Sequence, residues 1–416
     1  MSKLRIKSYE LRDVAVMQAP VSFCNHRGDV NPFIEVCGRE VYPIFVSPMA
    51  SVTNQNNYKV WIENKLTPVI PRSVQKSENN PNGLTFEERM ELAKETFVSI
   101  SLKEAQNELL MYLAGCYYDE EIKDFVYSTR KFVENPVYYI CIDIAHGTLS
   151  ELYDTCKKLK GRYGEQIIIM TGNVANPSAY SSYADAGIDF MRCSIGGGSR
   201  CTSSANVSIH FGTATLLDQL NEERKAYAHS HNGNAPTKII ADGGIGWFDD
   251  IQKALALGAD AVMCGKIFAE CEEACGEIYW AGSLEEAKDK TKRRYATHNE
   301  NELNLQGVNV QVNEFGTNSL EELKLYMKPY LPFRDYYGMS TKRAQKQISD
   351  DKTKLKTSEG IDKPVEVKYH VSEWVDNMQS YLRSCMTYTN SKTIQELREN
   401  SQVVILGGSG DLAYRK

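Results

Sequence analysis

The sequence predicts an α/β protein built as a (β/α)8 barrel, and the pattern of its apolar segments carries that prediction. Short apolar runs recur along the chain, and each precedes a polar or glycine-rich loop and then a segment with apolar residues at helical spacing. Runs that are apolar throughout are typical of parallel strands covered on both faces. The runs are PIFVSPMA, TPVIP, YYICIDIAHG, IIIMTGNVA, FMRCSIGGG, KIIADGGI and AVMCGKIFA.

The loops after these runs favour a closed barrel over an open, doubly wound sheet. The carboxyl ends of barrel strands converge on one mouth, whereas those of an open sheet are spread along an edge. No GxGxxG motif follows an early run, so the dinucleotide-binding fingerprint of the open sheet is missing. The polar and glycine residues that we expect at the mouth are Ser47, Asp143, Asn173, Gly196–Ser199, Asp242–Gly244 and Gly265.

Two segments interrupt the alternation, and we interpret both as insertions in a single catalytic barrel that spans residues 1–416. Residues 75–135 are predicted to be helical and polar, with SENNPNG as a loop. Residues 280–332 are rich in Lys, Glu and Asn, and their stretch AKDKTKRRYATHNENELN has the composition of a solvated or mobile segment.

Charge and composition narrow the class of protein. The net charge of −6 argues against non-specific nucleic-acid binding, but it does not exclude a phosphate-bearing ligand held by local backbone donors. The first residues lack the apolar core of a signal peptide, and no run is long enough for a membrane span. The 11 cysteines do not form a disulfide framework, so we expect a cytoplasmic protein.

The loop SIGGGSRCTSS, residues 194–204, carries the strongest chemical signal. Three glycines after a strand let the backbone approach a ligand closely and turn its N–H groups toward an anion. Cys201 follows on the same loop, where convergent N–H groups favour the nucleophilic thiolate. The alternative is a glycine-rich turn with an incidental buried cysteine.

Two further loops predict a nucleotide phosphate site. In IADGGIG, Asp242 followed by Gly243 and Gly244 suits a ribose diol and its phosphate, although Asp242 could instead cap the next helix. In MCGKIFA, Gly265 offers a backbone N–H and Lys266 a positive charge. Glycine-rich loops after consecutive late strands match the usual phosphate site of a barrel.

These motifs together resemble the IMP dehydrogenase / GMP reductase family. SIGGGSRCTS, IADGGI and MCGKIFA look like its cysteine and phosphate loops. The likeness begins at YELRDV and runs through SPMASVTN, CIDIAHGT and TGNVA to YYGMS, SEG and the tail SYLRSCMTYTNSKTIQELRENSQ. It covers most of the chain outside the two insertions.

The resemblance implies a homotetrameric barrel in which Cys201 attacks C2 of GMP or IMP, with a nicotinamide cofactor and K⁺. It implies a catalytic group of Cys201, Thr202, Ser203 and Glu359. The implied substrate-binding residues are Ser47, Met49, Ser199, Asp242, Gly243, Gly244, Gly265, Lys266, Tyr336, Gly338, Met339, Ser340, Ser358 and Gly360. The implied cofactor-binding residues are Arg27, Arg72, Asp143, Ile144, Ala145, Asn173, Ile195, Ser384 and Thr387. The implied monovalent-cation ligands are the carbonyls of Gly196, Gly198 and Cys201.

The chain departs from the family pattern at several positions. The family has Asp where Ala50 stands, Lys in place of Arg72, and Thr in place of Ser203. Serine keeps the hydroxyl but lacks the methyl group that restricts the rotamer. The stretch between Arg72 and Tyr138 is too short for the regulatory CBS-type domain typical of the dehydrogenases, so we expect none.

The two activities of the family differ in what leaves or arrives at C2. A dehydrogenase hydrolyses its adduct with water activated by an Arg-Tyr pair, and the segment after YYGMS contains no such pair. A reductase expels ammonia, which needs an acid–base relay that Ser203 and Glu359 could provide. The SEG triplet, Arg27 and the LRSCMTY tail also look like those of GMP reductases, so we expect reduction of GMP to IMP with NADPH.

Two alternatives stay open at this point. One is an IMP dehydrogenase that converts IMP to XMP with NAD. The other is a catalytically silent nucleotide-binding homologue, which Ala50 and Ser203 suggest. Retention of Cys201 and Glu359 argues against a silent protein, because binding alone needs neither a nucleophile nor a proton relay.

Overall fold

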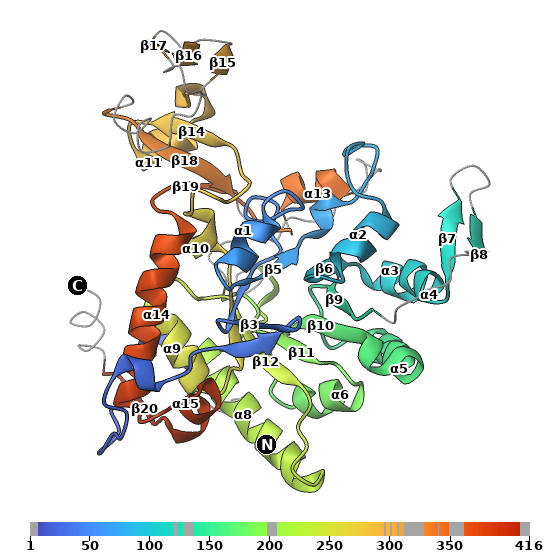
Figure 1. The fold of residues 1–416 in the computed structure, drawn as a ribbon, viewed down its shortest axis with the longest axis vertical. Helices are drawn as coiled ribbons and strands as arrows, with labels where there is room; N and C mark the ends of the chain where they lie inside the picture. The colour runs from blue at the N-terminus through green and yellow to red at the C-terminus, as the bar shows by residue number, and fades with distance from the viewer. Residues whose placement is uncertain are drawn as a thin grey trace.

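The central element of the structure, a computed structural model, is a closed barrel of eight parallel strands (Figure 1). The structure describes residues 7–119, 124–127, 136–197, 206–294, 297–299, 302–305, 308–311, 328–339, 341–348 and 362–407. The barrel strands are β4 (Ile44–Val46), β5 (Thr67–Ile70), β6 (Phe97–Ile100), β9 (Tyr138–Asp143), β10 (Ile167–Val174), β11 (Phe190–Cys193), β12 (Lys238–Asp242) and β13 (Ala261–Cys264). The barrel closes where β13 pairs with β4, with Val262 opposite Ile44. The (β/α)8 prediction is therefore confirmed.

Helices surround the barrel and cover its outer face (Figure 1). They are α1 (Tyr58–Glu63), α2 (Phe86–Leu92), α3 (Leu102–Gln106), α4 (Glu108–Leu113), α5 (Ser150–Tyr163), α6 (Ala179–Asp185), α8 (Thr213–Ser230), α9 (Phe248–Ala256), α10 (Lys266–Ala269), α14 (Val371–Tyr388) and α15 (Ile394–Asn400). Near the N-terminus, β1 (Val14–Val16) pairs with β20 (Val403–Ile405), so the two ends of the described chain lie together. Among the described residues, no helix is long and apolar enough to cross a membrane.

Large apolar side chains fill the interior of the barrel. Phe45, Phe97 and Phe190 come from three different strands, and their ring centroids lie 5.5–5.8 Å apart. Val36 and Val41, from the hairpin of β2 (Ile34–Val36) and β3 (Arg39–Val41), belong to the same buried cluster. The hairpin therefore closes one end of the packed interior, and ligands must approach from the opposite end.

The structure shows that the prediction of an insertion at residues 75–135 is wrong for most of this segment. This segment contains β6, the third barrel strand, which pairs with β5 and β9. It also contains the barrel helices α2, α3 and α4. The loop at residues 75–84 and the hairpin of β7 (Cys116–Asp119) and β8 (Asp124–Tyr127) are the described parts of this segment that stand outside the strand–helix alternation. The strand FVSI was missed because Ser99 interrupts its apolar run and the residues around it are polar.

The second expected insertion, residues 280–332, is partly built into a small sheet. Strand β14 (Ile278–Ala281) pairs with β18 (Leu331–Tyr336), which pairs with β19 (Lys363–Glu366). Ala287 is fully buried and Arg293 nearly so, although both lie in the stretch expected to be solvated. Here α11 (Leu284–Lys288) and η5 (Lys290–Lys292) follow β14, and the antiparallel strands β15 (Thr297–Asn299), β16 (Glu302–Leu305) and β17 (Val308–Gln311) form another sheet.

Replacing Phe97 with Ala should test whether β6 is an interior barrel strand. Phe97 is fully buried against three other rings, so Phe97→Ala should lower the free energy of unfolding by about 3–5 kcal/mol. Leu284 is 49% exposed, so Leu284→Ala should change it by less than about 0.5 kcal/mol. Chemical denaturation of both variants measures the difference, and equal losses would contradict the assignment of β6.

Candidate active site

Polar side chains gather at the carboxyl ends of four consecutive barrel strands. Asp143 ends β9, Asn173 lies near the end of β10, Arg192 is in β11 and Asp242 ends β12. All four lie at the end of the barrel opposite the β2–β3 hairpin. The structure therefore brings together three of the predicted mouth residues and adds Arg192, which the sequence did not single out.

Arg192 is a buried cation that joins the two carboxylates. Its Nη1 donates to Asp143 Oδ1 at 2.7 Å, while its Nε and Nη2 donate to Asp242 Oδ2 at 2.9 and 2.8 Å. The side chain of Arg192 is 7% exposed, and those of Asp143 and Asp242 are 16% and 13% exposed. Strands β9 and β12, which are not neighbours in the barrel, are thus connected through one guanidinium group.

The electrostatics of this bridge keep Arg192 charged. Burial alone would lower the pKa of the guanidinium, but the charges of Asp242 and Asp143 outweigh it and raise that pKa well above its ordinary value. The neighbouring thiol of Cys141, which accepts a hydrogen bond from Arg192 Nη1 at 3.6 Å, has its pKa raised to about 11 by burial. Cys141 is therefore a protonated structural thiol rather than a nucleophile.

Asn173 extends the bridge to the loop that follows β11. Its Nδ2 donates to Asp242 Oδ2 at 2.8 Å and to the Ser194 carbonyl at 3.1 Å. The preceding residue must be glycine, because a Cβ on Gly172 would lie 2.3 Å from the Arg192 carbonyl oxygen. The three hydrogen bonds that Asp242 accepts from Arg192 and Asn173 all go to Oδ2. A ligand hydroxyl would therefore bind to Oδ1.

The glycine loops after β11 and β12 lie against each other. A Cβ on Gly244 would be 3.4 Å from the Gly197 carbonyl oxygen, and one on Gly197 would be 2.6 Å from Ser194 Oγ. Gly196, Gly243 and Gly244 all have positive φ values, of 79°, 121° and 77°. These turns require glycine, and they leave backbone groups near the Asp242 carboxylate.

A second corner of the mouth is formed by Met49, Gly265 and Tyr336. A Cβ on Gly265 would lie 2.4 Å from Tyr336 Oη and 2.8 Å from Met49 Sδ. Gly265 precedes α10, whose first residue Lys266 is partly exposed and lies 3.4 Å from Glu270. Ser47 donates its N–H to the Cys264 carbonyl and is buried beside this corner. The structure therefore brings Met49, Gly265 and Tyr336, all predicted to bind the substrate, close together.

The other predicted mouth residues follow the strand ends. Ile144 and Ala145 continue from β9, Ile195 and Gly196 from β11, and Gly338 and Met339 from β18. Arg72 comes directly after β5, and its buried Nε has no hydrogen bond to the described residues. The remaining predicted residues lie outside the described part of the chain; they are Gly198, Ser199, Cys201, Thr202, Ser203, Ser340, Ser358, Glu359 and Gly360.

Three predicted cofactor residues lie away from the mouth. Ser384 and Thr387 are on α14, where each hydroxyl donates to a carbonyl of its own helix. The Arg27 carbonyl accepts a hydrogen bond from Arg383 of the same helix at 3.0 Å. Helix α14 runs along the side of the barrel opposite β9 (Figure 1), so within one chain these residues do not meet Asp143.

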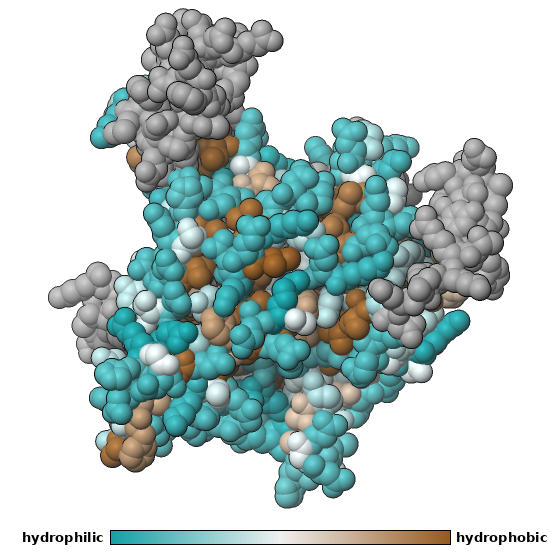
Figure 2. Space-filling model, in the orientation of Figure 1, coloured by the Kyte–Doolittle hydropathy of each residue, from teal (hydrophilic) through white to brown (hydrophobic). Residues whose placement is uncertain are grey.

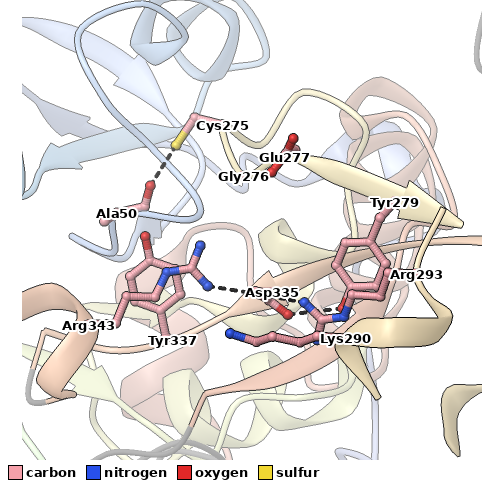
Figure 3. A pocket seen from close by; sticks show the side chains of 10 residues that line it. All are labelled: Ala50, Cys275, Gly276, Glu277, Tyr279, Lys290, Arg293, Asp335, Tyr337 and Arg343. Carbon is pink, nitrogen blue, oxygen red and sulfur yellow. Dashed lines mark hydrogen bonds and ion pairs between the residues drawn. The ribbon is translucent and has the colours of Figure 1, made fainter. Parts of the chain in front are cut away.

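A polar cavity of about 360 Å³ opens beside Ala50, between the small sheet and the barrel (Figure 3). Arg343, in α13 (Lys342–Ile348), donates to Asp335 at 2.8 Å and to Asp362 at 3.2 Å. Burial would raise the Asp335 pKa, but hydrogen bonds from Arg293, Arg343 and Tyr279 lower it below its ordinary value. Arg343 thus joins the chain on both sides of residues 349–361, the stretch in which Ser358 and Glu359 occur.

One feature of the sequence could have indicated the importance of Arg192. Arg192 is the charged residue in FMRC, an otherwise apolar strand. A buried arginine requires acidic partners, and acidic residues at the ends of neighbouring parallel strands are the ones within reach. Arg343 offered no comparable signal, because its partners are set by the small sheet.

Comparison with known proteins shows which family shares this arrangement. The family model described as IMP dehydrogenase / GMP reductase domain matches residues 101–328 and 324–412. The chain belongs to this family. The resemblance seen in the sequence is thereby confirmed.

Individual members of the IMP dehydrogenase / GMP reductase family are similar over part of their length. The inosine-5'-monophosphate dehydrogenase of Chlorobaculum parvum is 30% identical over 279 residues, covering 67% of this chain and 47% of that protein. The proteins of the same name from Bacillus subtilis and Methanocaldococcus jannaschii are 29% and 28% identical, over 69% and 68% of this chain and 48% and 49% of theirs. The chain spans about half the length of the curated relatives it matches.

Removing the charge of Arg192 should destabilise the protein strongly. Arg192→Met leaves two buried carboxylates without their partner, which should cost about 3–5 kcal/mol in the free energy of unfolding. Lys225→Met removes an exposed ion pair with Glu222 and should cost less than about 1 kcal/mol. Urea denaturation compares the two, and a loss for Arg192→Met no larger than for the control would refute the bridge.

Proposed function

We propose that this protein is a purine nucleotide oxidoreductase that reduces GMP to IMP and ammonia with NADPH, through a covalent adduct between Cys201 and C2. The observation that carries the proposal is the meeting of the glycine loop after β11 with the Asp242 loop after β12. That contact puts the loop in which Cys201 occurs beside the groups suited to a ribose and its phosphate. Family membership supports redox chemistry at a purine nucleotide.

Different residues at the barrel mouth would bind the ribose and the phosphate of the nucleotide. Asp242 Oδ1 would accept a ribose hydroxyl while Arg192 and Asn173 hold Oδ2. The backbone N–H groups of Gly243, Gly244 and Gly265 would bind the phosphate, with Lys266 adding charge. Because these groups are on β12 and β13, nucleotide binding would not depend on the thiol of Cys201.

The proposed reaction replaces the 2-amino group of GMP with hydrogen at C2. The Cys201 thiolate adds to C2 of GMP, and the 2-amino group leaves as ammonia after protonation through Ser203 and Glu359. NADPH supplies the hydride that C2 accepts. The thiolate then leaves C2, which gives IMP and restores the free cysteine.

The nicotinamide site would lie on the Asp143 side of the mouth. The buried Nε of Arg72, which has no hydrogen bond to the described residues, and the Ile144–Ala145 backbone fit a polar, planar group there. Asp143 would be oriented toward it by Arg192. For K⁺, the positive φ of Gly196 turns the chain where carbonyls would ring the ion.

The position of Arg27, Ser384 and Thr387 supports a homotetramer. These residues would reach a cofactor only from a second copy, because α14 lies across the barrel from β9 (Figure 1). Figure 2 shows apolar side chains at the lower left, where the N-terminal chain and the end of α14 lie in Figure 1. Val21, Phe23 and Tyr388, which belong to these two segments, are 60%, 75% and 63% exposed. Ser22 Oγ and the Thr387 carbonyl are hydrogen-bonded at 2.6 Å, so this surface adjoins the predicted cofactor residues.

A second candidate is oxidation of IMP to XMP with NAD. It is favoured by the names of the relatives, all three of which are inosine-5'-monophosphate dehydrogenases. Against it, residues 341–361 contain no Arg-Tyr pair to activate water, whereas they do contain the SEG triplet with Glu359. A silent nucleotide-binding homologue is the third candidate.

Turnover of purified protein should distinguish these candidates. We expect NADPH consumption with GMP, release of one ammonia per NADPH, and no XMP from IMP with either NAD or NADP. Cys201→Ala should abolish turnover yet keep nucleotide-dependent thermal stabilisation, because the phosphate loops are separate from the thiol. NADH production from IMP without NADPH consumption on GMP would establish the dehydrogenase, and stabilisation without turnover would establish the silent protein.

Potassium should stimulate this reaction. Carbonyls of Gly196, Gly198 and Cys201 would surround the ion and hold the cysteine loop, so removal of K⁺ should lower kcat more than the affinity for nucleotide. Initial rates in K⁺, Na⁺ and a large organic cation at constant ionic strength provide the measurement. Equal rates in all three salts would contradict the cation site.

A further inference from the structure

The N-terminal segment Ser8–Glu10 is bound to the chain that follows the cysteine loop. The Gly212 N–H donates to Ser8 Oγ at 2.6 Å, and the Ala214 N–H donates to the Tyr9 carbonyl at 3.1 Å. In return, the Tyr9 N–H donates to Thr215 Oγ1 at 2.8 Å. The segment therefore lies across the beginning of α8, more than 200 residues away in sequence.

The approach of the two segments is close enough to require glycine. A Cβ on Gly212 would lie 2.5 Å from the Tyr9 carbonyl oxygen and 2.6 Å from Ser8 Oγ. No side chain can be accommodated there without moving backbone. The N-terminal segment is therefore tightly packed against the chain at Gly212.

Glu10 and His210 connect the N-terminal segment to the glycine loop after β11. Glu10 Oε1 lies 2.7 Å from His210 Nε2, and His210 Nδ1 lies 2.9 Å from the Ile195 carbonyl oxygen. Ile195 is the second residue of SIGGGSRCTSS, the loop in which Cys201 occurs. The imidazole ring thus spans the distance between the N-terminal segment and that loop.

The contact with Ile195 sets which group donates there. A carbonyl oxygen only accepts hydrogen bonds, so His210 Nδ1 is the donor to the Ile195 carbonyl. The other Glu10 oxygen accepts the Thr213 N–H at 3.1 Å, while the Glu10 N–H donates to Asp13 Oδ2 at 2.8 Å.

We propose that Glu10 and His210 are positioning residues that hold the glycine loop after β11, so that the N-terminal segment helps to present Cys201 to the nucleotide. The proposal rests on the proposed function, since it supposes that Cys201 reacts. Among the described residues, the hydrogen bonds of Glu10 and His210 run to each other, to Asp13, to Thr213 and to Ile195, and not to Asp242 or Gly265. Their loss should therefore affect the chemical step and not nucleotide binding.

Two substitutions of His210 separate its contacts. Asparagine places an amide nitrogen where Nδ1 stands and keeps a donor for Ile195, whereas glutamine places one at Nε2 and loses that donor. We expect His210→Gln, His210→Asn and Glu10→Gln each to lower kcat about 3- to 10-fold with an unchanged KM for the nucleotide, because each breaks or weakens one of the two contacts that join Glu10 to Ile195. The double variant should be no slower than the slower single variant.

The chain offers a matched control at another histidine. His370, at the start of α14, lies 3.2 Å from Glu272 and 3.3 Å from Glu273, so it is also a histidine between acceptors. His370→Gln should leave kcat unchanged. A kcat equal to that of wild type in all these variants, or a loss in His370→Gln as large as in His210→Gln, would overturn the proposal.

Hydrogen exchange provides a test that does not depend on turnover. Backbone amides of peptides containing Ile195 should exchange faster in His210→Gln and Glu10→Gln than in wild type, with no change in His370→Gln. If the wild type shows no turnover with any nucleotide and cofactor, the proposed function fails, and this measurement still decides. Unchanged exchange in both variants would overturn the positioning role.

Discussion

The ion-paired group at the barrel mouth depends on one buried cation, Arg192. Its guanidinium holds Asp143 from β9 and Asp242 from β12, and both carboxylates are largely shielded from water. Two buried negative charges near each other would be unfavourable without it. The bridge therefore fixes the orientation of both carboxylates before any ligand arrives, and preorganised polar groups are what an active site requires.

The surrounding backbone is shaped by the same constraint. Gly172 has no room for a side chain because the Arg192 backbone lies against it. Asn173 donates hydrogen bonds to both Asp242 and the Ser194 carbonyl, and so connects the carboxylate to the loop after β11. The glycine loop after β11 is thus held from one side by Asn173 and from the other by His210. Both attachments are made to carbonyls at the start of the loop, so they act on its position without occupying the ligand space.

Much of this organisation could be predicted from the sequence, because seven of the eight strands are apolar runs with polar ends. The strand β6 could not, since Ser99 interrupts its apolar run and the segment falls in a polar stretch. Gly265, Tyr336 and Met49 were predicted to belong to one substrate site, and the structure shows that they lie together. Arg192 was missed because motif comparison looks at loops, whereas this side chain is in a strand. The burial of Arg293 depends on β14 and β18, which pair across about 50 residues and leave no local pattern.

The most direct test of the account is a crystal structure of the protein with GMP bound. It should show a ribose hydroxyl on Asp242 Oδ1 while Arg192 and Asn173 remain on Oδ2, with the phosphate at the N–H groups of Gly243, Gly244 and Gly265. The purine C2 should then face the Cys201 thiol. A nucleotide bound outside the mouth, or one that displaces Arg192 from Asp242, would contradict the central role given to the bridge.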